Sequence, residues 1–481
     1  MAGATRPMRR NPDPPVEPLP RSVLASLPQP AAGDAFERVR RQVGEGRTKT
    51  VVLDDDPTGT QTVHGVDVLA DWSVPSLAAA LADPRPCFFV LTNTRSLPAT
   101  EAAALVLEAT RNLSAAARAA GVDVAVLSRA DSTLRGHFAA ELDSIERGLG
   151  TPIDARIVIP AFFEGGRYTV GDVHYVAEGE SLVPAGQTEF ARDRTFGYRN
   201  SDLRAWIEEV THGSVRASDV ASIDIATLRA PGGAAAVRSR LRSLPAGAHL
   251  IVNAAAYPDL EVFTEGLLGA EAEGKRYLIR TAASFVRVRA AVEPQPLLSP
   301  GDIGGAGTDG GLVVVGSYTN RTTLQLNSLL ELPGVAGTEV DVDALVDVCS
   351  RAEEIRRSAA AARDAIRSGR HAVVYTSRER ESAAGTAGDL KTGRTVSDAL
   401  VQIVRAMPER PRFLIAKGGI TSCDIAIGAL GMRKATVLGQ ASPGVPVWNL
   451  GPETRYPGMK FVVWPGNVGG PEALRDLVRA V

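Results

Sequence analysis

The stretch Thr50-Val51-Val52-Leu53-Asp54-Asp55-Asp56-Pro57-Thr58-Gly59-Thr60 decides how this sequence is interpreted. Its first four residues are a short, mainly β-branched run, which is typical of a buried strand. Three carboxylates follow at the end of that strand, where they repel one another and are costly to bury without partners. A cluster of this kind can bind a cation, orient hydroxyl groups or remove a proton. The alternative is a solvated acidic turn, in which Thr58-Gly59 redirects the chain.

The composition is that of an ordinary globular protein. The 481 residues are 44% hydrophobic and 22% charged, which predicts about two or three domains. A formal net charge of −2 gives no reason to expect a nucleic-acid or membrane partner. Cys87, Cys349 and Cys423 form neither a metal-binding spacing nor a disulfide framework, which predicts a reducing, cytoplasmic location. No apolar run is long enough to cross a bilayer, and the sequence leaves a homodimer open.

Predicted strands alternate with predicted helices in two parts of the chain. Residues 1–45 form a Pro- and Ala-rich lead that we expect to be partly mobile, with a short helix at 34–43. A first domain covers 46–292, a Pro- and Gly-rich linker 293–311, and a second domain 312–481. The predicted strands are 50–53, 87–91, 122–127, 156–159 and 249–252, then 312–315, 372–376, 413–416, 436–438 and 461–463. This alternation predicts two α/β domains with mostly parallel sheets that face a cleft.

Arginines and hydroxyl groups follow several strands of the first predicted domain. The richest loop runs from Ser128 to His137 and joins a strand to a helix that begins at Phe138. Ligands of open α/β sheets bind at the carboxyl ends of the strands, and arginine grips carboxylates and phosphates through two parallel bonds. The candidate residues are Arg95, Arg129, Asp131, Ser132, Arg135 and Arg167. With Asp55 and Asp56 they suit a small polyhydroxylated acid; a helix cap with a local salt bridge is the alternative for the richest loop.

Glycine-rich turns follow the strands of the second predicted domain. The strand at 413–416 leads into Lys417-Gly418-Gly419-Ile420-Thr421-Ser422, where Thr421 or Ser422 can cap a helix that ends at Gly431. The apolar face of that helix is predicted to hold Cys423, Ile427 and Leu430. Such a turn can cradle a phosphate, although neither a P-loop nor a GxGxxG pattern is present. Loops at 316–320, 443–446 and 465–470 are also rich in glycine, and together they could frame a nucleotide; ordinary strand-to-helix connections are the alternative.

The histidines and cysteines are weak candidates for chemistry. His64, His137 and His174 lack the spacing of a metal site, so we predict structural roles for them. Cys423 lies at a predicted helix start, which could lower its pKa, but a packing role is favoured.

Taken in order, these motifs resemble the four-carbon acid sugar kinase family. The resemblance rests on Asp55-Asp56-Pro57-Thr58-Gly59, Asp131-Ser132-Thr133-Leu134-Arg135-Gly136, Gly316-Ser317, Gly418-Gly419 with Thr421, and Pro443-Gly444-Val445-Pro446. It extends over nearly the whole chain from about residue 48. It implies an ATP-dependent kinase for a small sugar acid such as threonate, erythronate or 3-oxo-tetronate. The first domain would bind the acid sugar, and the last would bind the nucleotide.

Several positions depart from the pattern of that family. Ile420 stands where an acidic residue is usual, and Asn253 stands where an aspartate is frequent. The last glycine loop, Trp464-Pro465-Gly466-Asn467-Val468-Gly469, differs from the common Lys-Ser-Gly-Gly-Phe-Gly form. The extension Thr58-Gly59-Thr60-Gln61-Thr62-Val63-His64 is also unlike the best-known members. These departures favour a different acid, such as a branched 3-oxo acid.

The resemblance implies a role for each candidate residue. Asp55 and Asp56 would be catalytic, binding the acceptor hydroxyls while one of them takes the proton. The acid would be bound by Thr58, Arg95, Arg129, Asp131, Ser132, Arg135 and Arg167. The nucleotide would be bound by Ser317, Thr319, Gly418, Gly419, Ile420, Thr421, Gly444, Asn467 and Gly469. The cofactors would be ATP and Mg²⁺, which bridges the phosphates in such reactions. A nucleotide-independent sugar-acid lyase or aldolase, or a non-catalytic sensor, stays open.

Overall fold

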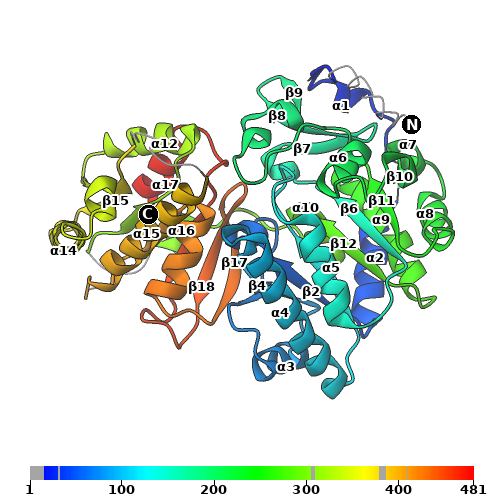
Figure 1. The fold of residues 1–481 in the computed structure, drawn as a ribbon, viewed down its shortest axis with the longest axis horizontal. Coiled ribbons are helices and arrows are strands. Elements are labelled where there is room, and N and C mark those ends of the chain that lie inside the picture. The colour runs from blue at the N-terminus through cyan, green and yellow to red at the C-terminus, as the bar shows by residue number, and fades with distance from the viewer. Residues whose placement is uncertain (1–15, 31–32, 305–308, 379–385, 409) are drawn as a thin grey trace, which may run out of the picture.

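A single twisted sheet runs through both halves of the chain and holds them side by side (Figure 1). It has 15 strands in the order β10-β11-β6-β12-β5-β2-β4-β3-β17-β18-β19-β16-β13-β15-β14. The computed structural model describes residues 16–30, 33–304, 309–378, 386–408 and 410–481. The predicted class, two α/β domains with mostly parallel strands, is confirmed, and the two domains share one continuous sheet.

The first eight strands in this order pair in parallel and form the first domain. Their bounds are β10 Val220–Ile223, β11 Ala248–Val252, β6 Ala155–Ile159, β12 Tyr277–Thr281, β5 Val124–Arg129, β2 Lys49–Asp54, β4 Cys87–Leu91 and β3 Asp67–Leu69. A separate four-stranded antiparallel sheet lies above them and consists of β1 Leu19–Pro20, β9 Ser181–Pro184, β8 Val173–Glu178 and β7 Arg167–Val170.

The other seven strands form the second domain. They are β17 Lys434–Ser442, β18 Val445–Leu450, β19 Lys460–Trp464, β16 Leu414–Lys417, β13 Leu312–Val315, β15 His371–Thr376 and β14 Val335–Val340. The strands from β19 to β14 pair in parallel, whereas β18 pairs antiparallel with both β17 and β19.

Helices cover both faces of the sheet because the buried strands have apolar side chains on both sides. In the first domain, one face is covered by α3 Val74–Ala82, α4 Ala99–Ala120, α5 Phe138–Leu149 and α6 Leu203–Val210. The other face is covered by α2 Ala35–Glu45, α7 Ile225–Arg229, α8 Gly233–Arg242, α9 Tyr257–Glu271 and α10 Ala283–Arg289. In the second domain, α12 Asn320–Leu330 and α17 Ala473–Ala480 lie on one face. The opposite face carries α13 Val342–Val346, α14 Arg351–Arg367, α15 Thr386–Arg405 and α16 Gly419–Asp424.

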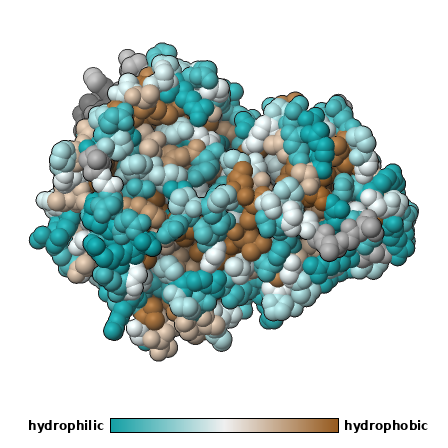
Figure 2. Space-filling view, turned by 180° about the vertical axis from the view of Figure 1, so that it is seen from behind, coloured by the Kyte–Doolittle hydropathy of each residue, from teal (hydrophilic) through white to brown (hydrophobic). Residues whose placement is uncertain are grey.

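The two domains are joined where β3 pairs antiparallel with β17. Asp67 stabilises this junction. Its buried carboxylate accepts a hydrogen bond from Arg85 of the first domain and one from Thr436 of the second, and it forms an ion pair with Lys434 of the second. Seen from behind, apolar side chains reach the surface in a narrow strip where the two lobes meet (Figure 2).

A second link comes from the turn that follows the acidic cluster. Thr60 and Gln61 lie in the segment 58–64 that directly follows the acidic cluster. Trp448 Nε1 donates a 2.9 Å hydrogen bond to Thr60 Oγ1, and Gln61 Nε2 donates a 3.0 Å bond to the Gly444 carbonyl. The segment therefore joins the two domains directly.

The predicted strands are present, with ends that differ by a few residues at most, except that β17 is much longer than its predicted core at 436–438. Residues 443–444 form the turn of the β17–β18 hairpin, so the prediction of another nucleotide loop there is wrong. The strands β1, β3, β7 to β10, β12, β14 and β18 were not predicted.

The helix after β16 differs from the prediction. Neither Thr421 nor Ser422 caps it, because the chain enters the helix through Gly418 at φ 118° and the Ser422 hydroxyl donates to the carbonyls of Ala416 and Gly418. A π-helical turn at Ile425–Ala429 then shifts the register, so that Ile427 is 37% exposed. Gly431 does end the element, in a left-handed conformation.

The ends of the predicted domains are left untested. Residues 1–15 and 31–32 of the lead, and 305–308 of the linker, lie outside the described residues. Within the lead, β1 pairs with β9, and α2 packs on α9 through the ion pair of Arg38 with Glu265. No helix in the described ranges is long and apolar enough to span a membrane. The domain boundaries, the cytoplasmic location and the homodimer stay predictions.

The link between Thr60 and Trp448 can be tested by a pair of isosteric substitutions. Thr60→Val should lower the free energy of unfolding by about 1–3 kcal/mol, because it leaves the buried Trp448 Nε1–H without a partner. Thr50→Val is the matched control, since Thr50 Oγ1 is buried in β2 without a hydrogen-bond partner among the described residues. Urea unfolding of both variants measures the difference, and equal losses would contradict the proposed link.

Candidate functional site

Each domain has one central strand at which the order of the strands reverses. In the first domain β2 lies between β4 and β5, and in the second β13 lies between β15 and β16. The chain leaves such a strand in opposite directions on its two sides, which opens a crevice at the carboxyl end. Asp54 to Asp56 lie at the first of these crevices, and Gly316 and Ser317 lie at the second.

The three carboxylates after β2 are all buried, so the solvated acidic turn is excluded. Asp54 Oδ1 accepts a 3.1 Å hydrogen bond from Arg129. Asp56 accepts a 2.8 Å bond from the Thr58 amide and forms an ion pair with Arg95. Asp55 differs from both, since neither of its carboxylate oxygens accepts a hydrogen bond from a described group, and Arg129 Nη1 lies 3.7 Å from its Oδ1.

Their surroundings give the three aspartates different acidities. Burial raises the pKa of Asp55 to about 6, against the pull of Arg95, Arg129 and Arg280. Burial raises the pKa of Asp54 further, to about 8, although Arg129 opposes it. For Asp56 the effect of burial is outweighed by Arg95, Arg129 and the Thr58 hydrogen bonds, so its pKa is lowered. Asp55 is thus the carboxylate that is largely ionised at neutral pH and still basic enough to accept a proton.

Three of the four candidate arginines already have carboxylate partners. Arg129 is buried and bonds Asp54, Thr58 and Gln61, which makes it part of the frame of the site. Arg95 pairs with Asp56 and lies 3.4 Å from Asp131. Arg135 donates to Asp131 at 2.7 Å and lies 3.4 Å from Asp193.

Arg167 is the exception. It is buried between the rings of Phe162 and Phe190, and its Nη1 donates to the Gly165 carbonyl. Its Nε has no hydrogen-bond partner, and it forms no ion pair with any described carboxylate. Burial lowers its pKa to about 10, and the nearby cations of Arg321 and Arg135 act in the same direction. A buried cation in this state is suited to an incoming anion.

The loop from Asp131 to Gly136 is held in a fixed, strained shape. Leu134 has a φ of 68°, a left-handed conformation that is unusual for a residue with a side chain. Two backbone carbonyls of the loop are fixed: that of Ser132 by His174 Nε2 at 2.8 Å, and that of Thr133 by Tyr198 at 2.8 Å. The predicted structural role of His174 fits these contacts, because burial lowers its pKa to about 4 and keeps it neutral. Gly136 leaves room for Asp55, whose Oδ2 would lie 3.1 Å from a Cβ placed there.

The second crevice is lined by hydroxyl groups and backbone. Ser317 Oγ accepts a 3.0 Å hydrogen bond from Thr322, and Thr319 caps α12 while donating to the Gly466 carbonyl at 2.8 Å. The Thr421 hydroxyl packs so closely on Gly316 that a Cβ there would lie 2.2 Å from it. Ser317, Thr319 and Thr421 therefore meet at one place, as the sequence predicted.

One predicted nucleotide-binding residue, Gly444, lies away from Ser317, Thr319 and Thr421. Both backbone polar groups of Gly444 are engaged, with Gln440 and Gln61, and it packs on Phe162 of the first domain. Ile420 is 46% exposed beside the glycine turn. The Asn467 carbonyl accepts from Arg321 at 3.2 Å, and Gly469 turns the chain at φ 86°.

The two crevices touch at Asp56 and Gly419. A Cβ placed on Gly419 would lie 2.0 Å from Asp56 Oδ2, so a residue with any side chain would collide with the carboxylate. The acidic strand end of one domain and the double glycine of the other are therefore in direct contact.

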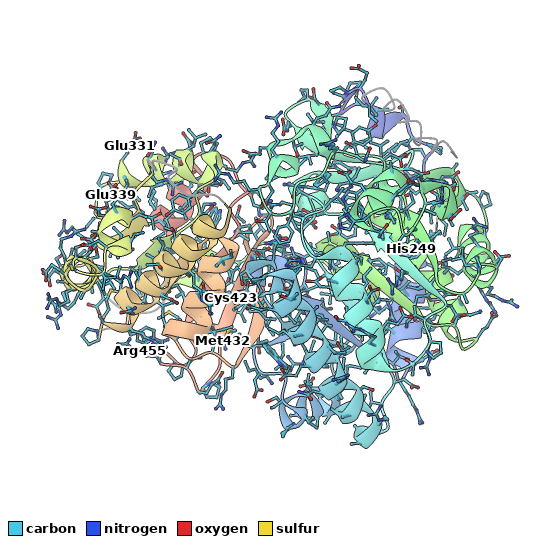
Figure 3. The ribbon with its side chains drawn as sticks, viewed as in Figure 1. His249, Glu331, Glu339, Cys423, Met432 and Arg455 are labelled. Carbon is cyan, nitrogen blue, oxygen red and sulfur yellow. The ribbon has the colours of Figure 1, made fainter. Side chains whose placement is uncertain are left out.

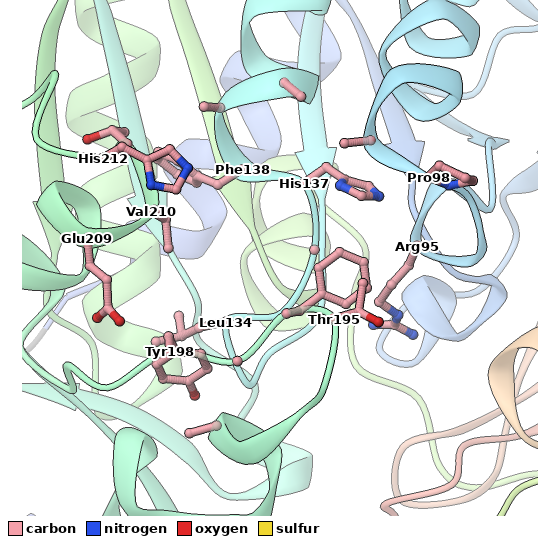
Figure 4. A pocket seen from close by; sticks show the side chains of 18 of the residues that line it. Arg95, Pro98, Leu134, His137, Phe138, Thr195, Tyr198, Glu209, Val210 and His212 are labelled. Carbon is pink, nitrogen blue, oxygen red and sulfur yellow. The ribbon is translucent and has the colours of Figure 1, made fainter. Parts of the chain in front are cut away.

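Two pockets open near this contact. One of about 470 Å³ lies between the domains and is lined by Thr92 and Asn93 from the first and by Gln402 and Asp424 from the second. The other, of about 970 Å³, has Arg95, His137 and Thr195 toward one end and Glu209 and His212 toward the other (Figure 4). The larger pocket leads to Arg95 and thereby to the aspartates.

Cys423 lies at the boundary between the domains (Figure 3). The helix start does not lower its pKa; burial raises it well above the usual value, and Asp424, Asp56 and Asp54 add to the effect. The thiol is thus kept neutral, in keeping with a packing role.

Sequence reasoning missed three cations of the second crevice: Lys417, Arg321 and Arg378. Arg378 Nη1 donates to the Ser317 carbonyl at 2.7 Å, and Lys417 is fully buried. One available signal was overlooked, namely a lysine at the end of an otherwise apolar strand directly before Gly418-Gly419. Among the described residues, no group of three or more His, Cys, Asp or Glu side chains could hold a metal ion.

Two family models match the chain in the order of its domains. Residues 50–289 match a sugar-binding N-terminal domain, and residues 312–474 match a nucleotide-binding C-terminal domain. The chain belongs to the four-carbon acid sugar kinase family. The first match contains the acidic strand end and the arginine loops, and the second contains the glycine turns.

Similar proteins agree with the family. A D-erythronate kinase of Heliobacterium modesticaldum is 28% identical over 318 residues, which are 64% of this chain and 66% of that protein. A D-threonate kinase of Bordetella bronchiseptica is 36% identical over 150 residues, 30% of this chain and 35% of that protein. The chain thus matches just under two thirds of the first relative's length and about a third of the second's.

Solved structures share the fold. A protein of Salmonella typhimurium LT2 has a TM-score of 0.61 at 18% identity, covering 91% of this chain and 99% of that one. Haemophilus influenzae protein HI1011 has a TM-score of 0.57 at 15% identity, covering 89% and 99%. At these identities the likeness extends to the fold alone.

The buried carboxylate of Asp55, which accepts no hydrogen bond from a described group, predicts a cost to stability that depends on pH. Its pKa is raised from 3.8 to about 6 in the folded chain, so the folded state binds the proton more tightly and loses stability as pH rises through this window. Asp55→Asn should therefore raise the free energy of unfolding by on the order of 2 kcal/mol at pH 7.5, and by less at pH 5.

Asp131→Asn is the control with the opposite sign. Although burial acts to raise the pKa of Asp131, Arg135, Arg95 and hydrogen bonds hold it well below the usual value, so its charge stabilises the fold at both pH values. Urea unfolding at pH 5 and 7.5 measures both effects. Destabilisation by Asp55→Asn at pH 7.5 would contradict the interpretation of Asp55 as an uncompensated carboxylate.

Proposed function

We propose that this chain is an ATP-dependent kinase that transfers the γ-phosphoryl group to a hydroxyl group of a small sugar acid. The contact between Asp56 and Gly419 carries the proposal, because it brings an acceptor site and a phosphate cradle together at two neighbouring strand ends. The names of the two relatives, D-erythronate kinase and D-threonate kinase, support a four-carbon acid as the acceptor.

On the acceptor side, Asp55 is the proposed base. Its carboxylate is buried, lacks hydrogen bonds from described groups and has a pKa raised to about 6. It can therefore take a proton from a hydroxyl group that attacks the γ-phosphorus. Asp56 is held by Arg95 and the Thr58 amide, which makes it the weaker base and better suited to orient a neighbouring hydroxyl.

The carboxylate of the acid is assigned to Arg167. The resemblance had favoured Arg135, yet Arg135 is paired with Asp131 and Asp193, whereas Arg167 has a buried guanidinium without an ion pair among the described residues. The guanidinium lies near the rings of Phe162 and Phe190, and its own planar fork suits two-pronged binding of a carboxylate.

On the nucleotide side, Gly418 and Gly419 let phosphate approach the backbone, and Ser317, Thr319 and Thr421 supply hydroxyl groups. Magnesium would neutralise charge on the phosphates. The Asp55 carboxylate, which accepts no hydrogen bond from a described group, fits a hard cation, and Mg²⁺ in such sites is bound largely through phosphates and water. Contact between the domains would exclude water from the reacting groups.

A direct assay tests the proposal against its alternatives. Release of ADP is measured over a panel of four- and five-carbon sugar acids, including branched and 3-oxo acids, with ATP and Mg²⁺. A kinase consumes ATP in proportion to one acid of the panel. A lyase or aldolase would consume the acid without ATP, and a sensor would bind acid or nucleotide in calorimetry without turnover; either result would refute the kinase.

Asp55→Asn should lower kcat by about 10²–10⁴-fold while KM for the acid changes little, because the base is lost but the shape is kept. Asp56→Asn should weaken binding of the acid more than it lowers kcat. Asp219→Asn, at an exposed position of the first domain, is the control. Steady-state kinetics of the three variants decide, and a near-normal kcat for Asp55→Asn would rule it out as the base.

Arg167→Lys keeps the charge but loses the planar pair of donors. Loss of a charge-assisted hydrogen bond, about 1.5–3 kcal/mol, should lower kcat/KM for the acid about 10- to 100-fold, with KM for ATP unchanged. Arg229→Lys is the matched control, since Arg229 is also buried but is fully paired with Asp259. If both substitutions leave the KM of the acid unaltered, the carboxylate is bound elsewhere.

A further inference from the structure

Lys417 is a buried lysine for which the fold alone gives little reason. It is fully buried at the end of β16, directly before the turn of Gly418 and Gly419. Its Nζ donates one hydrogen bond, to the Pro465 carbonyl at 2.7 Å, and lies 5.8 Å from the ring centre of Trp464. An ammonium group has three N–H donors, so a lysine in this position leaves donor capacity unused.

The charged groups around Lys417 are cations as well. Arg378, after β15, donates to the Ser317 carbonyl at 2.7 Å and to Thr323 Oγ1 at 2.8 Å. Arg321, in the first turn of α12, donates to the Asn467 carbonyl at 3.2 Å. Neither these two nor Lys417 forms an ion pair with a carboxylate in the described part of the chain. Burial lowers the pKa of Lys417 well below its usual value, and Arg321 and Arg378 lower it further.

The chain contains a second buried lysine for comparison. Lys49 lies at the amino end of β2, in the first domain, and its Nζ donates to the carbonyls of Asp83 and Arg85. Burial lowers its pKa too, but the carboxylate of Asp83 acts in the opposite direction. Among the described residues Lys417 has no such counter-charge, whereas Lys49 has the carboxylate of Asp83 nearby.

On the basis of the proposed function, we propose that Lys417 binds the terminal phosphate groups of the nucleotide, with Arg378 and Arg321 beside it. These three cations come from β16, β15 and α12, which surround the crevice after β13. A phosphate group there supplies the missing negative charge and pairs with all three. Its arrival favours the charged form of Lys417, so binding of phosphate is accompanied by uptake of a proton.

The alternative is that Lys417 only fixes the loop at Pro465. Calorimetry with ADP and with adenosine separates the two roles, because adenosine lacks the phosphates. Titrations at pH 7, 8 and 9, each in two buffers of different ionisation enthalpy, count the protons taken up. The variants are Lys417→Met, Lys417→Arg and, as the matched control, Lys49→Met, with thermal unfolding as a check of the fold.

For the wild type we expect binding of ADP with proton uptake and binding of adenosine without it. Lys417→Met should weaken ADP at least about tenfold, leave adenosine unchanged and abolish the uptake. Lys417→Arg, which is always charged, should retain more affinity for ADP than the methionine variant but take up no proton. Lys49→Met should behave as the wild type in both measurements.

The proposal is overturned if folded Lys417→Met binds ADP within twofold of the wild type, or if it loses adenosine as much as ADP. Should neither variant of Lys417 fold, the wild type decides, since equal proton uptake with ADP and adenosine refutes the proposal. A wild type that binds no nucleotide at all would refute the proposed function itself, which is a different result from an unaltered Lys417→Met.

Discussion

Burying three consecutive carboxylates at the end of β2 is the constraint on which the first domain depends. Carboxylates at one strand end can be buried together only if a proton or cations from other strands offset their charge, and the raised pKa of Asp54 keeps it largely protonated at neutral pH. Arg95 from the end of β4 and Arg129 from β5 supply the cations, and Arg280 from β12 is held nearby by Glu141 and Ser128. These arginines hold the carboxyl ends of the neighbouring strands together around the aspartates. The balance is incomplete, because Asp55 accepts no hydrogen bond from the described part of the chain, and that deficiency is what makes it a candidate base.

The same cluster also fixes how the two domains meet. The chain leaves Asp56 through a short 3-10 turn, Pro57–Thr60, whose last residue bonds Trp448 of the second domain. Gln61 accepts from Arg129 and donates to the Gly444 carbonyl, so one side chain links the arginine that donates to Asp54 to the β17–β18 hairpin. The cluster is therefore connected to the second domain directly, where Asp56 meets Gly419, and also through Gln61. Such a linkage would serve the proposed phosphoryl transfer, in which both substrates must be bound before water is excluded.

Much of this arrangement could be predicted from the sequence, because parallel strands and the loops after them leave local signals. Buried strands such as β4 and β13 are continuous apolar runs, and their bounds were predicted to the residue. The continuous sheet could not be predicted, since β3 has only three residues and its pairing partner β17 lies far away in the sequence. The prediction of a nucleotide loop at residues 443–446 was wrong for a related reason. A Pro-Gly turn can join the strands of a hairpin or form a phosphate loop, and only the pairing of the flanking strands distinguishes the two.

The roles of single arginines were beyond sequence reasoning for an electrostatic reason. Arg129, Arg135 and Arg167 all follow or flank strand ends, and nothing in their order says which of them is neutralised by a neighbour. The structure separates them by their partners. Arg129 and Arg135 form ion pairs with aspartates, whereas Arg167 forms no ion pair with a carboxylate of the described residues. Lys417 was overlooked because a lysine that ends an apolar strand is usually exposed, whereas this one is fully buried.

The two crevices are unbalanced in opposite senses. The first contains a carboxylate, Asp55, that lacks hydrogen bonds from described groups, and the second contains cations, Lys417 and Arg378, that form no described ion pairs. Each imbalance costs folding free energy, and a chain selected for stability alone would pair or remove such groups. An acceptor hydroxyl and a polyphosphate would correct both at once, the first by giving up a proton and the second by bringing negative charge. The stability lost in this way accompanies a preorganised site, which lowers the barrier to transfer because the groups need not reorient when the substrates arrive.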